Sequence, residues 1–104
     1  VVVHGLGGIA SAPYVWRGFQ AAQRAGFAAL SLNLRGADRS GEDLYHAGLT
    51  EDLHAVLASP ELARYEELYL MGYSLGGHVA LKAACEPGDP RLVAVAAICA
   101  PLDL

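Results

Sequence analysis

The stretch from Leu68 to Val79 constrains the fold of this chain more than any other. It runs Leu-Tyr-Leu-Met-Gly-Tyr-Ser-Leu-Gly-Gly-His-Val. An apolar run typical of a buried strand ends at Gly72, and apolar residues at helical spacing begin just after Ser74. The sequence therefore predicts a strand, a sharp turn and a helix in immediate succession. Ser74 stands on the turn, with Gly72 and Gly76 two residues to either side of it.

The glycines on either side of Ser74 have a steric explanation. A serine on so sharp a turn is forced into an unfavourable backbone conformation, and side chains two residues away would collide, so glycine is needed at Gly72 and Gly76. The Ser74 hydroxyl then stands over the first N–H groups of the following helix, which lack helical partners and favour negative charge. This pattern indicates a serine nucleophile, with the Leu75 amide as an oxyanion donor. The structural alternative is that Gly72 ends a strand while Gly76 and Gly77 allow close helix packing.

The rest of the chain alternates between strand and helix patterns. Strands are expected at residues 1–4, 27–34, 67–73 and 92–100, and helices at 13–25, from Thr50 onward, from Ser59 onward and at 75–85. This alternation predicts an α/β domain with a parallel sheet and helices on both faces. Ligands of such sheets bind at the carboxyl ends of strands, where the strand order reverses. The predicted strand order is therefore 2-1-3-4, which places the loop after the first strand beside Ser74.

That loop runs His-Gly-Leu-Gly-Gly at residues 4–8. Because Gly5 and Gly7 carry no side chains, its backbone can approach Ser74 closely, and the Leu6 amide is expected to join the Leu75 amide in holding an oxyanion.

The same glycines also fit the dinucleotide pattern G-x-G-x-x-A, with Arg35 placed to contact a 2′-phosphate in an NADP-binding Rossmann domain. Two features disfavour that alternative. Pro13 fits poorly inside a helix that starts at the glycines, and Asn33 stands where an acid is expected.

Four histidines are candidates for the general base, and none fits well. His4 closes the first strand and is expected to fix its loop by hydrogen bonding. His46 and His54 are expected to be surface or packing residues. His78 lies on the same helix as the nucleophile, not across the crevice. Asp103 is expected to cap the segment that follows it and not to orient a histidine.

Composition limits the class of protein. The chain has 104 residues, is 54% hydrophobic and 17% charged, and begins inside a strand at Val1, so we expect part of a larger domain. A net charge of −4 without a basic cluster excludes a nucleic-acid footprint. The spacing of Cys85 and Cys99 suits no metal, and both are expected to be buried free thiols. No metal or organic cofactor is expected.

The longest apolar run, Leu92 to Ala100, is too short to span a bilayer. We therefore expect no transmembrane segment and a cytoplasmic location, although a missing leader carries little weight when the true start of the chain is not seen.

At five places the residues resemble the α/β-hydrolase fold. The segments are residues 4–8 (HGLGG), 33–36 (NLRG), 44–48 (LYHAG), 51–53 (EDL) and 72–77 (GYSLGG). More narrowly, they are similar to a branch of bacterial predicted hydrolases related to the eukaryotic α/β-hydrolase-domain proteins and the yeast medium-chain ester synthases. The resemblance covers essentially the whole chain, in order, and residues 44–48 are its more specific part. His78 departs from the Asn of that branch, which bears on the surroundings of the turn.

The resemblance implies that Ser74 is the nucleophile and that the Leu6 and Leu75 amides form the oxyanion hole. It also implies that the four strands are the central ones of an eight-stranded sheet. An acid and a histidine would follow Leu104, so residues 1–104 would be a partial domain that is inactive alone. The expected activity is hydrolysis of carboxylic esters, in the manner of a carboxylesterase or acylglycerol lipase, on a small-molecule substrate. The alternatives are acyl transfer to an alcohol and a non-catalytic binding module.

Overall fold

The computed structural model describes residues 1–5, 8–35 and 50–101. Leu6, Gly7, His46 and Asp103 lie outside the described residues. The strands are β1 (Val2–Val3), β2 (Ser31–Leu32), β3 (Leu68–Tyr73) and β4 (Leu92–Ile98). They form one parallel sheet in the order β2-β1-β3-β4, which confirms the predicted order 2-1-3-4 and the α/β class.

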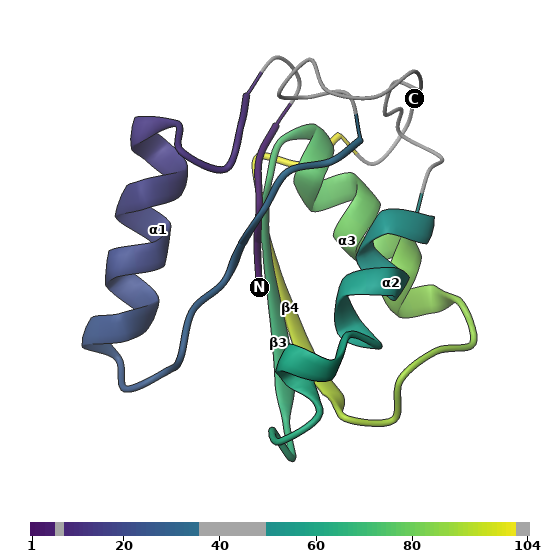
Figure 1. Cartoon of the computed structure of the whole chain (residues 1–104). Helices are drawn as coiled ribbons and strands as arrows, with labels where there is room; N and C mark the ends of the chain where they lie inside the picture. The colour runs from purple at the N-terminus through teal and green to yellow at the C-terminus, as the bar shows by residue number, and fades with distance from the viewer. Residues whose placement is uncertain (6–7, 36–49, 102–104) are drawn as a thin grey trace.

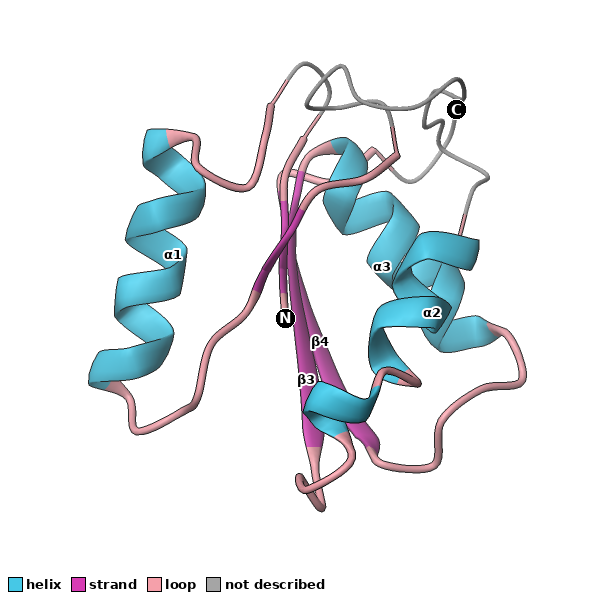
Figure 2. Cartoon of the chain, in the orientation of Figure 1, coloured by secondary structure: helices cyan, strands magenta, loops and turns pink. Residues whose placement is uncertain are grey.

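The helices lie on both faces of this sheet. They are α1 (Pro13–Arg24), α2 (Glu51–Leu57) and α3 (Leu75–Cys85), with a short 3-10 helix at Pro60–Leu62. Viewed along its edge, the sheet has α1 on one face and both α2 and α3 on the other (Figure 1). Strand and helix alternate along the described chain, as the colours of Figure 2 show. The two faces are called below the α1 face and the α3 face.

The core lies on the α3 face. Burial alternates along β3, where Leu68 and Leu70 are buried and Tyr69 and Met71 are only partly covered. The buried cluster also includes Val3, Leu34, Leu53, Leu57, Leu62, Val79, Ala80 and Ala83. Full burial of one such Leu or Val side chain contributes roughly 1.5–3 kcal/mol. This cluster therefore fixes α2 and α3 on the sheet and with them the start of α3.

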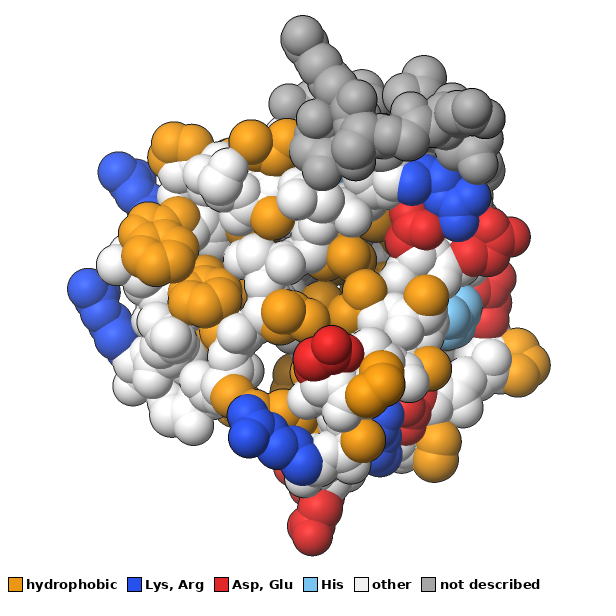
Figure 3. Space-filling view, in the orientation of Figure 1, with side chains coloured by type: hydrophobic (Ala, Val, Ile, Leu, Met, Phe, Trp, Pro, Cys, Tyr) orange, Lys and Arg blue, Asp and Glu red, His pale blue; other side chains and the backbone are white. Residues whose placement is uncertain are grey.

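The α1 face is covered less completely. α1 begins at Pro13, packs Val15 and Gly18 inward, and is followed by Gly26 at φ 93°, as expected for a helix stop. It contacts β1 and β2, whereas the neighbouring part of β3 remains open. A hollow of about 900 Å³ lies there, between the segment around Phe27 and strands β3 and β4. Hydrophobic side chains gather around it in the space-filling view (Figure 3).

All four strands are shorter than predicted: β1 covers two of the four expected residues and β3 begins one residue later than expected. The strand expected at residues 27–34 pairs only at Ser31–Leu32, because its partner β1 offers two paired residues. Just before Ser31, the Leu30 carbonyl accepts a hydrogen bond from the Val2 N–H at 2.7 Å. Phe27, at the start of the expected strand, is 46% exposed. The last strand ends at Ile98, because Cys99 has a φ of 53°, which no regular strand contains.

The expected burial of the cysteines is wrong. Cys85 and Cys99 are both exposed free thiols. The buried residues of α3 include Val79, Ala80 and Ala83, and Cys85, at the end of the helix, lies off that face. Cys99 lies just past the end of β4. Hydrophobic neighbours in the sequence do not indicate whether a cysteine side chain faces the core or the solvent.

Hydrogen bonds of Arg91 connect the segments at one end of the α3 face. The Arg91 guanidinium donates to the carbonyl oxygens of Leu57, Leu62 and Tyr65, the first of which belongs to the last turn of α2. The Asp89 carboxylate pairs with the same guanidinium, which lowers the pKa of Asp89 to about 2. Arg91 thus satisfies carbonyl groups that a helix end leaves without partners.

Candidate active site

Ser74 lies on the turn between β3 and α3, at the carboxyl end of the sheet. Its backbone has φ 52° and ψ −117°, a region that residues other than glycine rarely occupy. The Ser74 N–H donates to the Ile98 carbonyl at 2.8 Å, and the Ser74 carbonyl accepts the His78 N–H at 3.1 Å. The side chain is exposed. The strained serine is therefore anchored by its own backbone and presents its hydroxyl to solvent.

The glycines at Gly72 and Gly76 are there for steric reasons. A Cβ on Gly72 would lie 2.4 Å from the Gly76 carbonyl oxygen. A Cβ on Gly76 would lie 2.2 Å from the His4 carbonyl oxygen and 2.7 Å from that of Val3. These distances are far below van der Waals contact. The atoms involved belong to the backbone, which cannot move aside as a flexible side chain can. The turn can therefore bring α3 back against Gly72, and α3 can approach β1, only with glycine at Gly72 and Gly76 respectively.

The loop after β1 lies against this turn. A Cβ placed on Gly5 would stand 3.3 Å from the Ser74 Cβ and 3.1 Å from the Tyr73 carbonyl oxygen. The approach follows from the sheet, because β1 and β3 are direct neighbours. Leu6 and Gly7, the other predicted residues of this loop, lie outside the described residues. Leu75 is the first residue of α3, where helix amides lack an intrahelical acceptor.

His4 holds this loop in place. Its Nε2 accepts the Leu34 N–H at 3.0 Å, so Nδ1 is the protonated nitrogen and donates to the Gly5 carbonyl at 2.8 Å. The side chain is fully buried. The expectation that His4 fixes its loop is thus confirmed. Because both ring nitrogens are engaged away from solvent, His4 is not a candidate general base.

The other described histidines also have partners elsewhere. His54 Nε2 lies 2.9 Å from Glu86 Oε1, between α2 and the end of α3. His78 Nδ1 lies 2.7 Å from the Pro101 carbonyl oxygen. Within the described part of the chain, no histidine is hydrogen-bonded to the Ser74 hydroxyl.

Two tyrosines that the sequence analysis passed over join α1 to the site. The Tyr14 hydroxyl oxygen accepts the Gly5 N–H at 2.8 Å. The rings of Tyr14 and Tyr73 meet edge to face, with centroids 5.1 Å apart and planes at 76°. Tyr73 directly precedes Ser74. The available sequence signal was an aromatic residue beside the serine together with another in the first turn of the helix that follows the glycine loop.

The dinucleotide alternative finds no support in the structure. α1 begins at Pro13 and not at the glycines. The Arg35 guanidinium donates to Asp52 Oδ1 from Nε at 3.0 Å and from Nη2 at 2.8 Å, and these bonds hold the pKa of Asp52 below its usual value. Arg35 is therefore engaged in tying the end of β2 to α2.

Across residues 1–5, 8–35 and 50–101, no three side chains of His, Cys, Asp or Glu come together as metal ligands would. None of the helices in those ranges has the length and apolarity needed to cross a bilayer.

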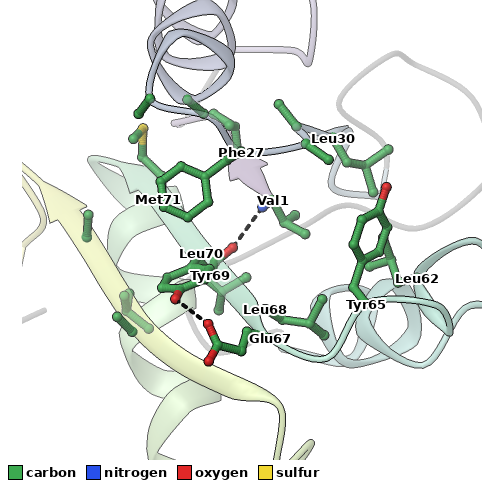
Figure 4. A pocket seen from close by; sticks show the side chains of 18 of the residues that line it. Val1, Phe27, Leu30, Leu62, Tyr65, Glu67, Leu68, Tyr69, Leu70 and Met71 are labelled. Carbon is green, nitrogen blue, oxygen red and sulfur yellow. Dashed lines mark hydrogen bonds between the residues drawn. The ribbon is translucent and has the colours of Figure 1, made fainter.

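The large hollow beside β3 is not the site around Ser74. Its walls come from Val1, Phe27 and Leu30, from the segment around Tyr65, and from β3 up to Met71 (Figure 4). These residues lie toward the amino ends of the strands, whereas Ser74 follows the carboxyl end of β3. The hollow thus opens between the segment before β2 and β3, with residues of both faces in its lining, and is separate from the serine turn.

Comparisons with known proteins bear on the family. A family profile described as the alpha/beta hydrolase fold matches residues 1–104. The comparison with curated proteins finds no match, and neither does the comparison with solved structures. The narrower branch proposed from residues 44–48 stays a prediction. A serine on the strand-to-helix turn of a parallel α/β sheet is the arrangement that this fold requires. The chain belongs to the α/β-hydrolase fold family.

Proposed function

We propose that this chain carries the nucleophile of a serine hydrolase, and that Ser74 is that nucleophile. The observation that carries the proposal is the strained φ of 52° at an exposed serine on the β3–α3 turn. Strain of this kind persists only where the surrounding structure imposes it, and it concentrates at functional sites. Here the close packing of the turn and α3 imposes it, and Gly72 and Gly76 permit that packing because no side chain would fit there.

The proposed chemistry is acyl transfer through a covalent intermediate. The Ser74 oxygen attacks the ester carbonyl, and the alcohol leaves with a proton from the general acid. Water then attacks the acyl-enzyme and releases the carboxylic acid. The Leu75 amide at the start of α3 is the described donor suited to the oxyanion, and the Leu6 amide is the second donor in the proposal.

The general base and its orienting acid are assigned to a histidine and an Asp or Glu outside the described residues. The support is indirect, since His4, His54 and His78 are each bonded to another group. In this fold the acid and histidine follow the nucleophile along the chain. The substrate class proposed is a small carboxylic ester, including acylglycerols, and the reaction needs no metal or organic cofactor.

Labelling by a fluorophosphonate probe tests this proposal on the full-length protein. We expect a single covalent adduct on Ser74, found by mass spectrometry of the digested protein. Ser74→Ala should abolish labelling and lower kcat for a nitrophenyl ester by about 1000-fold or more. Ser59→Ala is the matched control, because its hydroxyl bonds the Val56 carbonyl at the end of α2.

Retained turnover in Ser74→Ala, or an adduct on another serine, would place the nucleophile elsewhere. Adding an alcohol to the reaction separates hydrolysis from acyl transfer, because transfer yields a new ester in place of the free acid.

A further inference from the structure

We infer that Tyr14 is a positioning residue of this site, whose hydroxyl holds the Gly5 peptide at its working distance from Ser74. The inference rests on the proposed function, because positioning has a kinetic meaning only if Ser74 is the nucleophile. It assigns a role in the reaction to α1, a helix that presents no residue directly to the serine.

The first support is the hydrogen bonding of Gly5. Its N–H donates to the Tyr14 hydroxyl at 2.8 Å, and its carbonyl accepts the Gly8 N–H at 3.0 Å and the His4 Nδ1–H at 2.8 Å. Gly5 is buried, so its N–H needs an acceptor inside the protein. The two bonds to the Gly5 carbonyl are local, because they come from His4 and Gly8, which are close to Gly5 in the sequence. The bond to Tyr14 is the one that ties Gly5 to a different element.

The second support is the fit of the hydroxyl between two glycines. A Cβ on Gly8 would lie 2.3 Å from the Tyr14 hydroxyl oxygen, and a Cβ on Gly5 would lie 3.5 Å from it. The hydroxyl therefore occupies space that a side chain at Gly8 would fill, and it lies at ordinary contact distance from the Cβ position of Gly5. The Tyr14 hydroxyl is the closest of the neighbours that favour glycine at Gly8.

The third support is the contact between the two tyrosine rings. Tyr14 meets the ring of Tyr73 edge to face, and Tyr73 is bonded directly to Ser74. The Tyr73 hydroxyl reaches back to α1, where a Cβ on Gly18 would lie 2.3 Å from it. Tyr14 thus touches the loop through its hydroxyl and the serine turn through its ring. The pairing of β1 with β3 brings Gly5 and Ser74 together, and Tyr14 contacts the segments on both sides of that spacing.

A positioning role predicts a defect in the transition state and not in substrate binding. Oxyanion donors act only at the correct distance, and a displacement of about 1 Å costs on the order of 100-fold in rate. Tyr14→Phe keeps the ring contact with Tyr73 and removes the acceptor of the Gly5 N–H. We expect kcat to fall about 10- to 100-fold while KM changes less than about twofold.

The experiment compares Tyr14→Phe with Tyr69→Phe in the full-length protein. Tyr69 loses the same hydroxyl, but that group bonds the exposed Glu67, away from the site. A boronic acid that mimics the tetrahedral intermediate should bind Tyr14→Phe more weakly by the same factor by which kcat/KM falls. Tyr69→Phe should match the wild type in both measurements. Wild-type kcat in Tyr14→Phe, or a kcat loss without weaker boronic-acid binding, would overturn the inference.

Gly8→Ala gives an independent test if Tyr14→Phe does not fold. The added methyl would displace the Tyr14 hydroxyl, so the variant should show the same loss of kcat. Where both single variants fold, the double variant lacks the hydroxyl that the methyl would displace, so the two losses should not add. Additive losses would overturn the inference. If the wild type is not labelled at Ser74, the proposed function fails and this inference fails with it. If the wild type is labelled and Tyr14→Phe has a normal kcat, only the role of Tyr14 is rejected.

Discussion

The two faces of the sheet differ sharply although the same strands supply both. On the α3 face, Leu68 and Leu70 are 5% and 2% exposed, under α3 and α2. On the α1 face, the alternate residues Tyr69 and Met71 are only half-buried and line a hollow of about 900 Å³. The coverage differs, because α1 contacts β1 and β2 and meets β3 at Tyr73, whereas Tyr69 and Met71 border the hollow.

This difference shows two ways of holding one serine. On the α3 face Ser74 is held by backbone contacts, such as that between Gly76 and the His4 carbonyl. On the α1 face it is held by side chains, where Tyr73 meets Tyr14. Backbone atoms in a packed sheet and helix cannot move independently, whereas a tyrosine can rotate. We therefore expect the α3 face to tolerate almost no change near the site and the α1 face to tolerate more.

The largest effect is expected from Gly76→Ala. In most helices this change is stabilising by up to about 1 kcal/mol. Here the methyl would stand 2.2 Å from the His4 carbonyl oxygen, so we expect a loss of about 3 kcal/mol or more and no esterase activity. Urea unfolding of the full-length protein measures it. Gly88→Ala is the control, because its nearest neighbour would be a side-chain atom of His54 at 3.4 Å. A stabilised Gly76→Ala would refute the backbone contact.

A second comparison uses neighbouring residues of β3 that face opposite sides. Leu70→Ala removes a buried side chain from the α3 face and should cost about 2–3 kcal/mol. Met71→Ala removes a half-buried one from the α1 face and should cost about 1 kcal/mol or less. The free energy of unfolding from urea titration distinguishes them. Equal losses would mean that the hollow is filled in solution and that the two faces are alike.

Much of this arrangement could be predicted because it depends on local patterns. The strand before Gly72 and the helix after Ser74 are adjacent in sequence, so periodicity and glycine spacing determine the turn. The strand order 2-1-3-4 was predicted from one requirement, namely that the two glycine loops lie at the same edge of the sheet.

What failed depended on contacts between distant segments. The length of β2 is limited by its partner β1, which is distant in the sequence. The pattern of residues 27–34 alone does not indicate this limit. Cys99 is exposed and follows β4, a strand in which Val93 and Ile98 are also exposed. Tyr14 was overlooked because its partner Tyr73 comes from a different element, and pairing of this kind appears only in three dimensions.

Gly18→Ala sharpens the comparison, because its methyl would meet a side chain at nearly the distance found for Gly76. The methyl would lie 2.3 Å from the Tyr73 hydroxyl, the free end of a ring that can turn away. We expect a loss of about 1 kcal/mol in stability and a modest fall in kcat, since the Tyr73 ring shifts beside Ser74. Tyr73→Phe in the same background removes the clashing oxygen and should restore stability. If Gly18→Ala is as damaging as Gly76→Ala, side-chain contacts on the α1 face are as rigid as backbone contacts.

The smallest effect is expected from Glu86→Gln, at the rim of the α3 face. Glu86 Oε1 accepts the Thr50 hydroxyl at 2.6 Å and lies 2.9 Å from His54 Nε2, and these bonds lower its pKa from 4.5 to about 2. A carboxyl whose pKa is lower in the folded state adds stability above its unfolded pKa and loses that contribution as pH falls through its folded pKa. The Tm difference between wild type and Glu86→Gln should therefore be constant above about pH 4.5, shrink between pH 4.5 and 2, and vanish near pH 2. Because the Glu86 side chain is 34% exposed, 1 M salt should also reduce the difference. A Tm difference that stays the same from pH 7 to pH 2 would mean that Glu86 acts by packing and not by charge.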